Sequence, residues 1–138
     1  MATVFGLDFG TANSLVSFVQ EDRELDRSVS RPLMHLADGR PHPSVVWYSA
    51  ERPIVGREAR DQMSELGIGV FGDIVRSPKR YLGGQVPIVI GDVPRSAVDV
   101  VGEVLSYLRE DALGRGFPEQ DFSRAVMTVP VSMTGRAR

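Results

Sequence analysis

The sequence of 138 residues contains no cysteine. This absence excludes disulfide bonds, thiolate zinc sites and cysteine nucleophiles. A strong excess of charge of one sign is also missing, because 16 basic residues face 18 acidic ones and the formal net charge is −2. We therefore expect no electrostatic bias toward nucleic acid or an anionic membrane.

Long apolar runs are missing as well, and none approaches the ~20 residues that a membrane-spanning helix needs. The first residues lead directly into an expected strand, without the basic region and cleavage site of a secretory leader. From these absences we expect a cytoplasmic protein. The 138 residues, 42% of them hydrophobic, make one domain's worth of chain with enough apolar side chains for a buried core.

Lysine is almost absent, since Lys79 is the single lysine among the 16 basic residues. All the other basic residues are arginine, so the preference of this chain for arginine does not extend to position 79. This exception indicates that a lysine is required there. A compact ammonium group can act as a point charge on a phosphate or an attacking water, whereas the wider guanidinium group cannot replace it without displacing something. The alternative is a chance lysine on the solvated surface.

Near the N-terminus, two apolar runs are interrupted by glycine and small polar residues. The runs at residues 3–8 and 15–19 predict a β-hairpin. In its turn, Gly10 lets the backbone approach an anion closely, and successive amides of a tight turn can form an anion-binding concavity. Thr11, Asn13 and Ser14 offer further donors, so the turn is a candidate phosphate cradle.

Asp8 ends the first of these runs, immediately before the turn. A carboxylate there is a candidate ligand for Mg²⁺, through water, because Mg²⁺ keeps much of its hydration shell at phosphate sites. The stretch lacks the Gly-Lys-Ser/Thr of a P-loop and the third glycine of a Rossmann fingerprint, and a strand follows where both motifs need a helix. The alternative is a structural hairpin in which Asp8 and Asn13 only satisfy their own turn.

The remaining chain alternates strands with two helices. A short helix is expected over residues 57–66, and residues 77–84 form a turn-bounded segment. Residues 68–75 have no assignable pattern. The expected strands are residues 29–36, which Pro32 restricts to an edge or broken strand, and residues 44–48, 54–55, 86–90 and 124–129.

The clearest helix begins after Ser96, which can cap it together with Asp99 three residues later. Gly114 or Gly116 ends it. A helix between strands that can share one sheet indicates an α/β arrangement. Its apolar stripe is expected to comprise Val98, Val101, Leu105, Leu108 and Ala112.

Five ordered segments resemble the actin-like ATPase superfamily and, within it, the seventy-kilodalton heat-shock chaperones, or heat shock protein 70 family. The resemblance spans nearly the whole chain and implies an α/β fold: the first lobe of an actin-like ATPase, with a ribonuclease-H-like sheet and helix plus a smaller α+β subdomain. The segments are Gly6-Leu7-Asp8-Phe9-Gly10-Thr11-Ala12-Asn13-Ser14, Pro43-Ser44-Val45-Val46, Val55-Gly56-Arg57-Glu58-Ala59, Lys79-Arg80-Tyr81-Leu82-Gly83 and Ala125-Val126-Met127-Thr128-Val129-Pro130.

The resemblance also implies site residues. Asp8 would bind the Mg²⁺ water shell and take part in catalysis, and Lys79 would orient the attacking water and offset transition-state charge. Pro130 and Arg138 would couple the nucleotide state to a substrate-binding domain. The loop around the phosphates of ATP or ADP would comprise Gly10, Thr11, Ala12 and Asn13.

The chain departs from the family pattern at two places. Ala12 stands where the family usually has a second threonine, so one hydroxyl near the phosphates is lost. Val131-Ser132-Met133 replaces Ala-Tyr-Phe, which puts the coupling relay in doubt.

By the family's pattern, the chain is expected to be a fragment that stops before the second lobe and the peptide-binding domain. Residues 1–37 and 94–138 would form the lower subdomain of the first lobe and residues 38–93 the upper one. The parent would be an ATP hydrolase whose cycle drives protein folding, with the second lobe, peptide clients, J-domain proteins and nucleotide-exchange factors as partners. The isolated fragment would be inactive.

The alternative function is a catalytically weak interaction or regulatory module. A sugar kinase of the same superfamily is disfavoured, because the segments around Pro43 and Lys79 are not kinase features.

Overall fold

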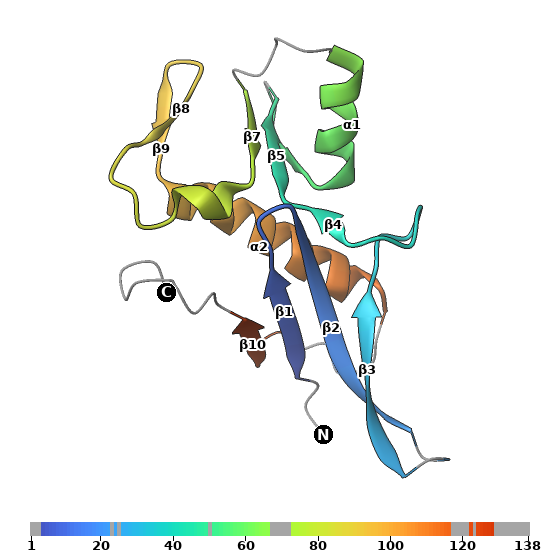
Figure 1. The fold of residues 1–138 in the computed structure, drawn as a ribbon. Helices are drawn as coiled ribbons and strands as arrows, with labels where there is room; N and C mark the ends of the chain where they lie inside the picture. Colours follow the sequence, from blue (N-terminus) through green and yellow to red (C-terminus); the bar gives the residue numbers. More distant parts are fainter. Residues whose placement is uncertain are drawn as a thin grey trace.

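The computed structural model describes residues 4–22, 24, 26–49, 51–66, 73–116, 122 and 124–128. Within these residues the chain forms three sheets, two α-helices and one short 3-10 helix (Figure 1). The helices are α1 (Arg57–Leu66), η1 (Pro78–Tyr81, the 3-10 helix) and α2 (Ala97–Gly114). The strands are β1 (Phe5–Phe9), β2 (Asn13–Asp22), β3 (Arg27–Leu33), β4 (His42–Pro43), β5 (Val45–Tyr48), β6 (Pro53–Val55), β7 (Ile74–Arg76), β8 (Ile88–Ile90), β9 (Val93–Arg95) and β10 (Ala125–Thr128).

The largest sheet has the strand order β10-β1-β2-β3, with β4 paired to β2. Alternate residues of β1 point into the core, where Phe5, Leu7 and Phe9 are buried, as the two-residue period of a strand requires. The predicted hairpin of β1 and β2 is confirmed. Because β10 runs parallel to β1, the carboxyl ends of these two strands meet at one edge of the sheet, and the α/β class is confirmed.

The strand β3 lies at the end of this order and runs antiparallel to β2 through seven paired positions. Pro32 sits within it, opposite Ser17. An edge strand tolerates proline because no neighbour needs its missing N–H group. The edge position is as predicted, although the strand is unbroken and begins two residues earlier than expected.

A second sheet has the order β6-β5-β7 and is covered by α1, whose bounds agree with the prediction (Figure 1). A small core of Val45, Ala59 and Ile74 joins the sheet to this helix. The strand β7 lies in the stretch that had no assignable pattern. The hairpin of β8 and β9 forms the third sheet, and the turn-bounded segment contains η1.

The helix α2 begins with the predicted capping box. The Ser96 side chain accepts a hydrogen bond from the Asp99 N–H group at 3.1 Å, and the Asp99 carboxylate accepts one from the Ser96 N–H group at 3.1 Å. These bonds satisfy amides that the first turn of any helix leaves without partners.

The buried face of α2 differs from the predicted stripe. Val101, Leu108 and Ala112 are buried as expected, but Val98 is 70% exposed and Leu105 is only partly buried. The helix buries the neighbouring row of apolar residues spaced four apart, because that row faces the two sheets. This row consists of Val100, Val104, Leu108 and Ala112.

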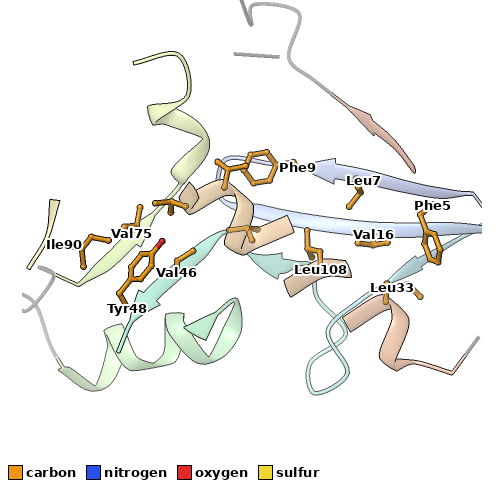
Figure 2. Close-up of a cluster of buried hydrophobic side chains, with 14 residues drawn as sticks. Phe5, Leu7, Phe9, Val16, Leu33, Val46, Tyr48, Val75, Ile90 and Leu108 are labelled. Carbon is orange, nitrogen blue, oxygen red and sulfur yellow. The ribbon is translucent and has the colours of Figure 1, made fainter. Parts of the chain in front are cut away.

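One hydrophobic core runs along α2 and joins the largest sheet to the second sheet. In Figure 2, Phe5, Val16 and Leu33 lie toward one end of this core and Tyr48 and Val75 toward the other, with Leu108 of α2 between them. The helix therefore holds the two sheets in a fixed relation. The predicted division into a lower and an upper subdomain stays a prediction.

The strand β10 is exposed at all four residues, in spite of its apolar sequence, and the Val126 side chain is 66% exposed. This exposure follows from its place at the end of the strand order. Neither α1 nor α2, the described α-helices, is long and apolar enough to cross a membrane.

Candidate functional site

The turn between β1 and β2 is built around a glycine that no other residue can replace. A Cβ atom on Gly10 would lie 2.1 Å from the Asn13 carbonyl oxygen, which is far inside the contact distance of the two atoms. The turn is open to solvent, since Ala12 and Asn13 are exposed and Thr11 is half-buried. A tight turn of this kind presents backbone amides to an anion.

Asp8 lies at the carboxyl end of β1, with its side chain exposed. In the parallel pairing its partner in β10 is Thr128. The Thr128 hydroxyl donates a hydrogen bond to Asp8 Oδ1 at 2.8 Å, which orients the carboxylate beside the turn. Thr128 was not predicted as a site residue; the signal was its place at the end of an apolar strand that could run beside β1.

Lys79 reaches the same turn from a segment 70 residues further along the chain. Its ammonium group donates a hydrogen bond to the Phe9 carbonyl oxygen and lies 5.4 Å from the centre of the Phe9 ring. Phe9 stands between Asp8 and Gly10 in the sequence. The structure therefore brings the single lysine and the predicted phosphate turn together.

The backbone conformation around η1 determines the direction in which the Lys79 side chain extends. Ser77 precedes η1 with a φ of 52°, in the left-handed region, and Pro78 is fully buried. Proline at the first position of η1 needs no hydrogen bond for its nitrogen. The buried proline anchors the segment, so the lysine beside it extends toward the hairpin.

Two buried serines support the turn from the core side. Ser14 was expected to be a further donor of the turn, but its hydroxyl faces Ser44 inside the core. Ser44 was not predicted as a site residue. Ser14 and Ser44 are 1% and 0% exposed, and their hydroxyl oxygens are 2.8 Å apart. The Ser44 hydroxyl donates to the Gly10 carbonyl oxygen at 3.0 Å. The segment Pro43-Ser44 was noted as family-like, but its contact with the turn depends on tertiary packing.

His42 anchors β4, which carries Ser44 toward the turn. It is 1% exposed. Its Nε2–H group donates to the Leu33 carbonyl oxygen at 3.1 Å, and its Nδ1 atom is hydrogen-bonded to the Tyr107 hydroxyl at 3.1 Å. Burial lowers the pKa of His42 below its ordinary value, and burial raises the pKa of Tyr107 to about 12.

The donor set fits a magnesium ion that is held largely through water. Asp8 offers an exposed carboxylate, and Mg²⁺ is commonly bound by one or two carboxylates together with waters and substrate phosphates. Among the described residues there is no group of three or more His, Asp or Glu side chains that could enclose a metal ion directly. Pro130 and Arg138, the predicted coupling residues, lie outside the described residues.

Two hollows on the described surface are lined by neither Asp8 nor the turn. One of about 350 Å³ lies between β6, α1 and α2, and one of about 510 Å³ borders β7 and η1. The second hollow is lined by Ser77 and Arg80, on either side of Lys79. Among the described residues, Asp8 and the exposed part of the turn thus lie on an open surface outside these two hollows.

Comparison with known proteins finds similarity to chaperones named DnaK. No protein-family model matches the chain. The chaperone protein DnaK of Deinococcus deserti is 31% identical over 148 residues, which cover 94% of this chain and 22% of that protein. The chaperone protein DnaK of Mycoplasmoides gallisepticum is 32% identical over 132 residues, and that of Thermosipho melanesiensis is 29% identical over 129 residues. Each of these two matches covers 92% of this chain and 20% of the relative.

The chain therefore spans about a fifth of the length of the curated relatives that it matches. The match extends over nearly all of the chain, and the described α/β fold agrees with the fold that the motifs implied. The chain is therefore similar, over nearly all of its length, to part of the DnaK chaperones, which agrees with the resemblance of its motifs to the nucleotide-binding domain of the heat shock protein 70 family.

Proposed function

We propose that this chain forms one wall of a Mg·ATP site in a longer chaperone of the heat shock protein 70 family. The observation that carries the proposal is the contact of Lys79 with the Phe9 carbonyl oxygen. This contact supports the proposal because Phe9 stands between Asp8 and Gly10 in the sequence, so the only lysine of the chain reaches the residue that joins the carboxylate to the glycine turn.

In this proposal each residue has a role that matches its geometry. The turn from Gly10 to Asn13 binds phosphate oxygens through its backbone amides, and Lys79 orients the attacking water and stabilises transition-state charge as a point charge. Asp8, oriented by Thr128, holds water molecules of the metal shell. When bound, Mg²⁺ neutralises charge on the β- and γ-phosphate oxygens.

The wider cycle of the parent protein belongs to the same proposal. Hydrolysis of ATP in a cleft closed by a second lobe would drive conformational changes that assist protein folding, in the cytoplasm, with J-domain proteins and nucleotide-exchange factors as partners. Pro130 and Arg138 would pass the nucleotide state to a peptide-binding domain. Support for these steps is the similarity to chaperones named DnaK.

The test is ATP hydrolysis by the full-length parent with substitutions at Lys79. We expect Lys79→Ala to lower kcat by roughly 100-fold, the usual effect of removing one group that stabilises transition-state charge, while the Kd for ATP changes little. Lys79→Arg should restore little, because a guanidinium group does not fit the place of an ammonium group. Arg109→Ala, on the exposed face of α2, is the matched control for loss of a basic residue.

A second candidate function is a nucleotide-independent interaction module. It is favoured by Ala12, which leaves an exposed position of the turn without a hydroxyl. Near-normal hydrolysis by Lys79→Ala, or no hydrolysis and no nucleotide binding by the wild-type parent, would overturn the first proposal. The second outcome would favour the module.

A further inference from the structure

Ser44 connects the two halves of the candidate site. It is 0% exposed. Its N–H group donates to the Ala12 carbonyl oxygen at 2.9 Å, and its own carbonyl oxygen accepts from the Ser77 N–H group at 3.0 Å. One residue thus binds the phosphate turn on one side and the segment that carries Lys79 on the other.

The hydroxyl of Ser44 adds a third link, and its direction follows from proton count. A hydroxyl group has one proton, and the Ser44 proton goes to the Gly10 carbonyl oxygen, which can only accept. The Ser14 hydroxyl must therefore donate to Ser44 Oγ across the 2.8 Å between them. The result is a directed chain from Ser14 through Ser44 to Gly10.

Holding the carbonyl groups of the turn also orients its amides. A peptide unit is planar and trans, so its C=O and N–H bonds point in opposite directions. The Ser44 hydroxyl holds the Gly10 carbonyl and thereby turns the Thr11 N–H group away from the core. The Ser44 N–H group holds the Ala12 carbonyl and does the same for the Asn13 N–H group.

We propose that Ser44 is a positioning residue, which orients the amides of the phosphate turn and sets their distance from Lys79. This inference rests on the proposed function and extends it to a residue that is fully buried on the core side of the turn. Its hydroxyl acts through the Gly10 carbonyl, and its backbone acts through Ser77. Loss of the hydroxyl releases the peptide between Gly10 and Thr11 while both backbone links remain.

The experiment separates positioning from stability with three variants of the full-length parent. Ser14→Ala removes the first bond of the chain and leaves the bond from Ser44 to Gly10. Ser44→Ala removes both bonds and leaves the buried Ser14 hydroxyl without its partner, which lowers stability. The double variant removes both hydroxyls, so no buried hydroxyl is left unpaired and stability recovers in part.

The order of the three variants in kcat should differ from their order in stability. We expect kcat for ATP hydrolysis to fall about tenfold or more in Ser44→Ala and equally in the double variant, because small misplacements of reacting groups have effects of this size. Ser14→Ala should stay within about threefold of wild type. If kcat instead recovers with melting temperature in the double variant, Ser44 has only a structural role and the inference is wrong.

Amide hydrogen exchange of the turn, measured without nucleotide, provides a readout that does not depend on hydrolysis. Ser44→Ala and the double variant should exchange the amides of residues 10–13 faster than wild type, and Ser14→Ala should not. Unchanged exchange in Ser44→Ala would overturn the inference. Faster exchange in a parent that neither binds nor hydrolyses ATP would reject the proposed function and leave the positioning of the turn by Ser44 standing.

Discussion

Asp8 and Thr128 meet at the carboxyl ends of two parallel strands, where the carboxylate is open to solvent. An exposed hydrogen bond of this kind contributes little to the free energy of unfolding, and asparagine keeps an oxygen that can accept it. A structural role and a metal role for Asp8 therefore predict different results for the same substitution.

We expect Asp8→Asn to change the stability of the nucleotide-free parent by well under ~1 kcal/mol. It should markedly reduce the gain in melting temperature on addition of Mg·ATP, because that gain reflects binding to the folded state. Thermal melts of wild type and Asp8→Asn, each with and without Mg·ATP, measure both quantities. Equal ligand-induced shifts in the two proteins would reject the metal role.

The buried side chain of His42 makes the stability of the protein depend on pH. Burial lowers its pKa in the folded state below the ordinary value of 6.5, so the unfolded chain binds the proton more readily. In the window below pH 6.5 the unfolded state holds more protons, and stability falls as the pH falls. The titratable groups around His42 are Tyr107, Asp111, Arg115 and His35, whose ring lies beside that of His42.

We therefore expect urea unfolding of the 138-residue chain to show a loss of stability between pH 7 and pH 5. His42→Gln keeps a donor and an acceptor but cannot be protonated, so its free energy of unfolding should depend less steeply on pH than that of wild type. The variant should also be less stable than wild type at pH 7. His35→Gln is the control, because His35 is partly exposed. A pH slope in His42→Gln as steep as in wild type would assign the effect to other groups.

At the scale of elements, α2 shows how tertiary packing selects among apolar rows. Val98 and Val104 belong to the same helix and have the same side chain, yet Val98 is 70% exposed and Val104 is 1% exposed. The helix has to cover two sheets at once, and the row with Val104 faces both.

The two valines supply a matched pair of substitutions. Val104→Ala removes two buried carbon atoms and leaves a cavity, so we expect a loss of about 2 kcal/mol in the free energy of unfolding. Val98→Ala should change stability by less than ~0.5 kcal/mol, as surface substitutions usually do. Denaturant melts at pH 7 compare the two directly. Similar losses in both variants would contradict the orientation of α2.

At the scale of the molecule, Asp8 is exposed among the described residues and lines neither of the two hollows described above. The chain spans about a fifth of its DnaK relatives, and affinity depends on a few well-placed anchors that act together. The groups described here can therefore supply only part of the binding free energy for a nucleotide.

We expect the isolated 138-residue chain to bind Mg·ATP with a Kd in roughly the millimolar range, a free energy of about −4 kcal/mol, and to show no hydrolysis above background. Isothermal titration calorimetry measures the first and phosphate release the second. The full-length parent is the comparison and should bind far more tightly. Micromolar binding by the isolated chain would show that this wall is a complete site.

The sequence alone determined the features that depend on neighbours along the chain. The hairpin of residues 3–19, the capping box of Ser96 and Asp99, and the bounds of α1 follow from turn residues, caps and periodicity, which act over a few residues. The motifs also indicated the family, because five ordered segments resemble it, and the similarity to DnaK chaperones over nearly all of the chain agrees with this.

Only the tertiary structure decided which distant groups meet. The contact of Lys79 with Phe9, the burial of Ser14 against Ser44 and the bond from Thr128 to Asp8 join residues between 30 and 120 positions apart. For the same reason the predicted stripe of α2 included the exposed Val98 and left out the buried Val100 and Val104. Such contacts depend on how sheets and helices share one core, and that arrangement is a property of the whole packed chain, which no local pattern contains.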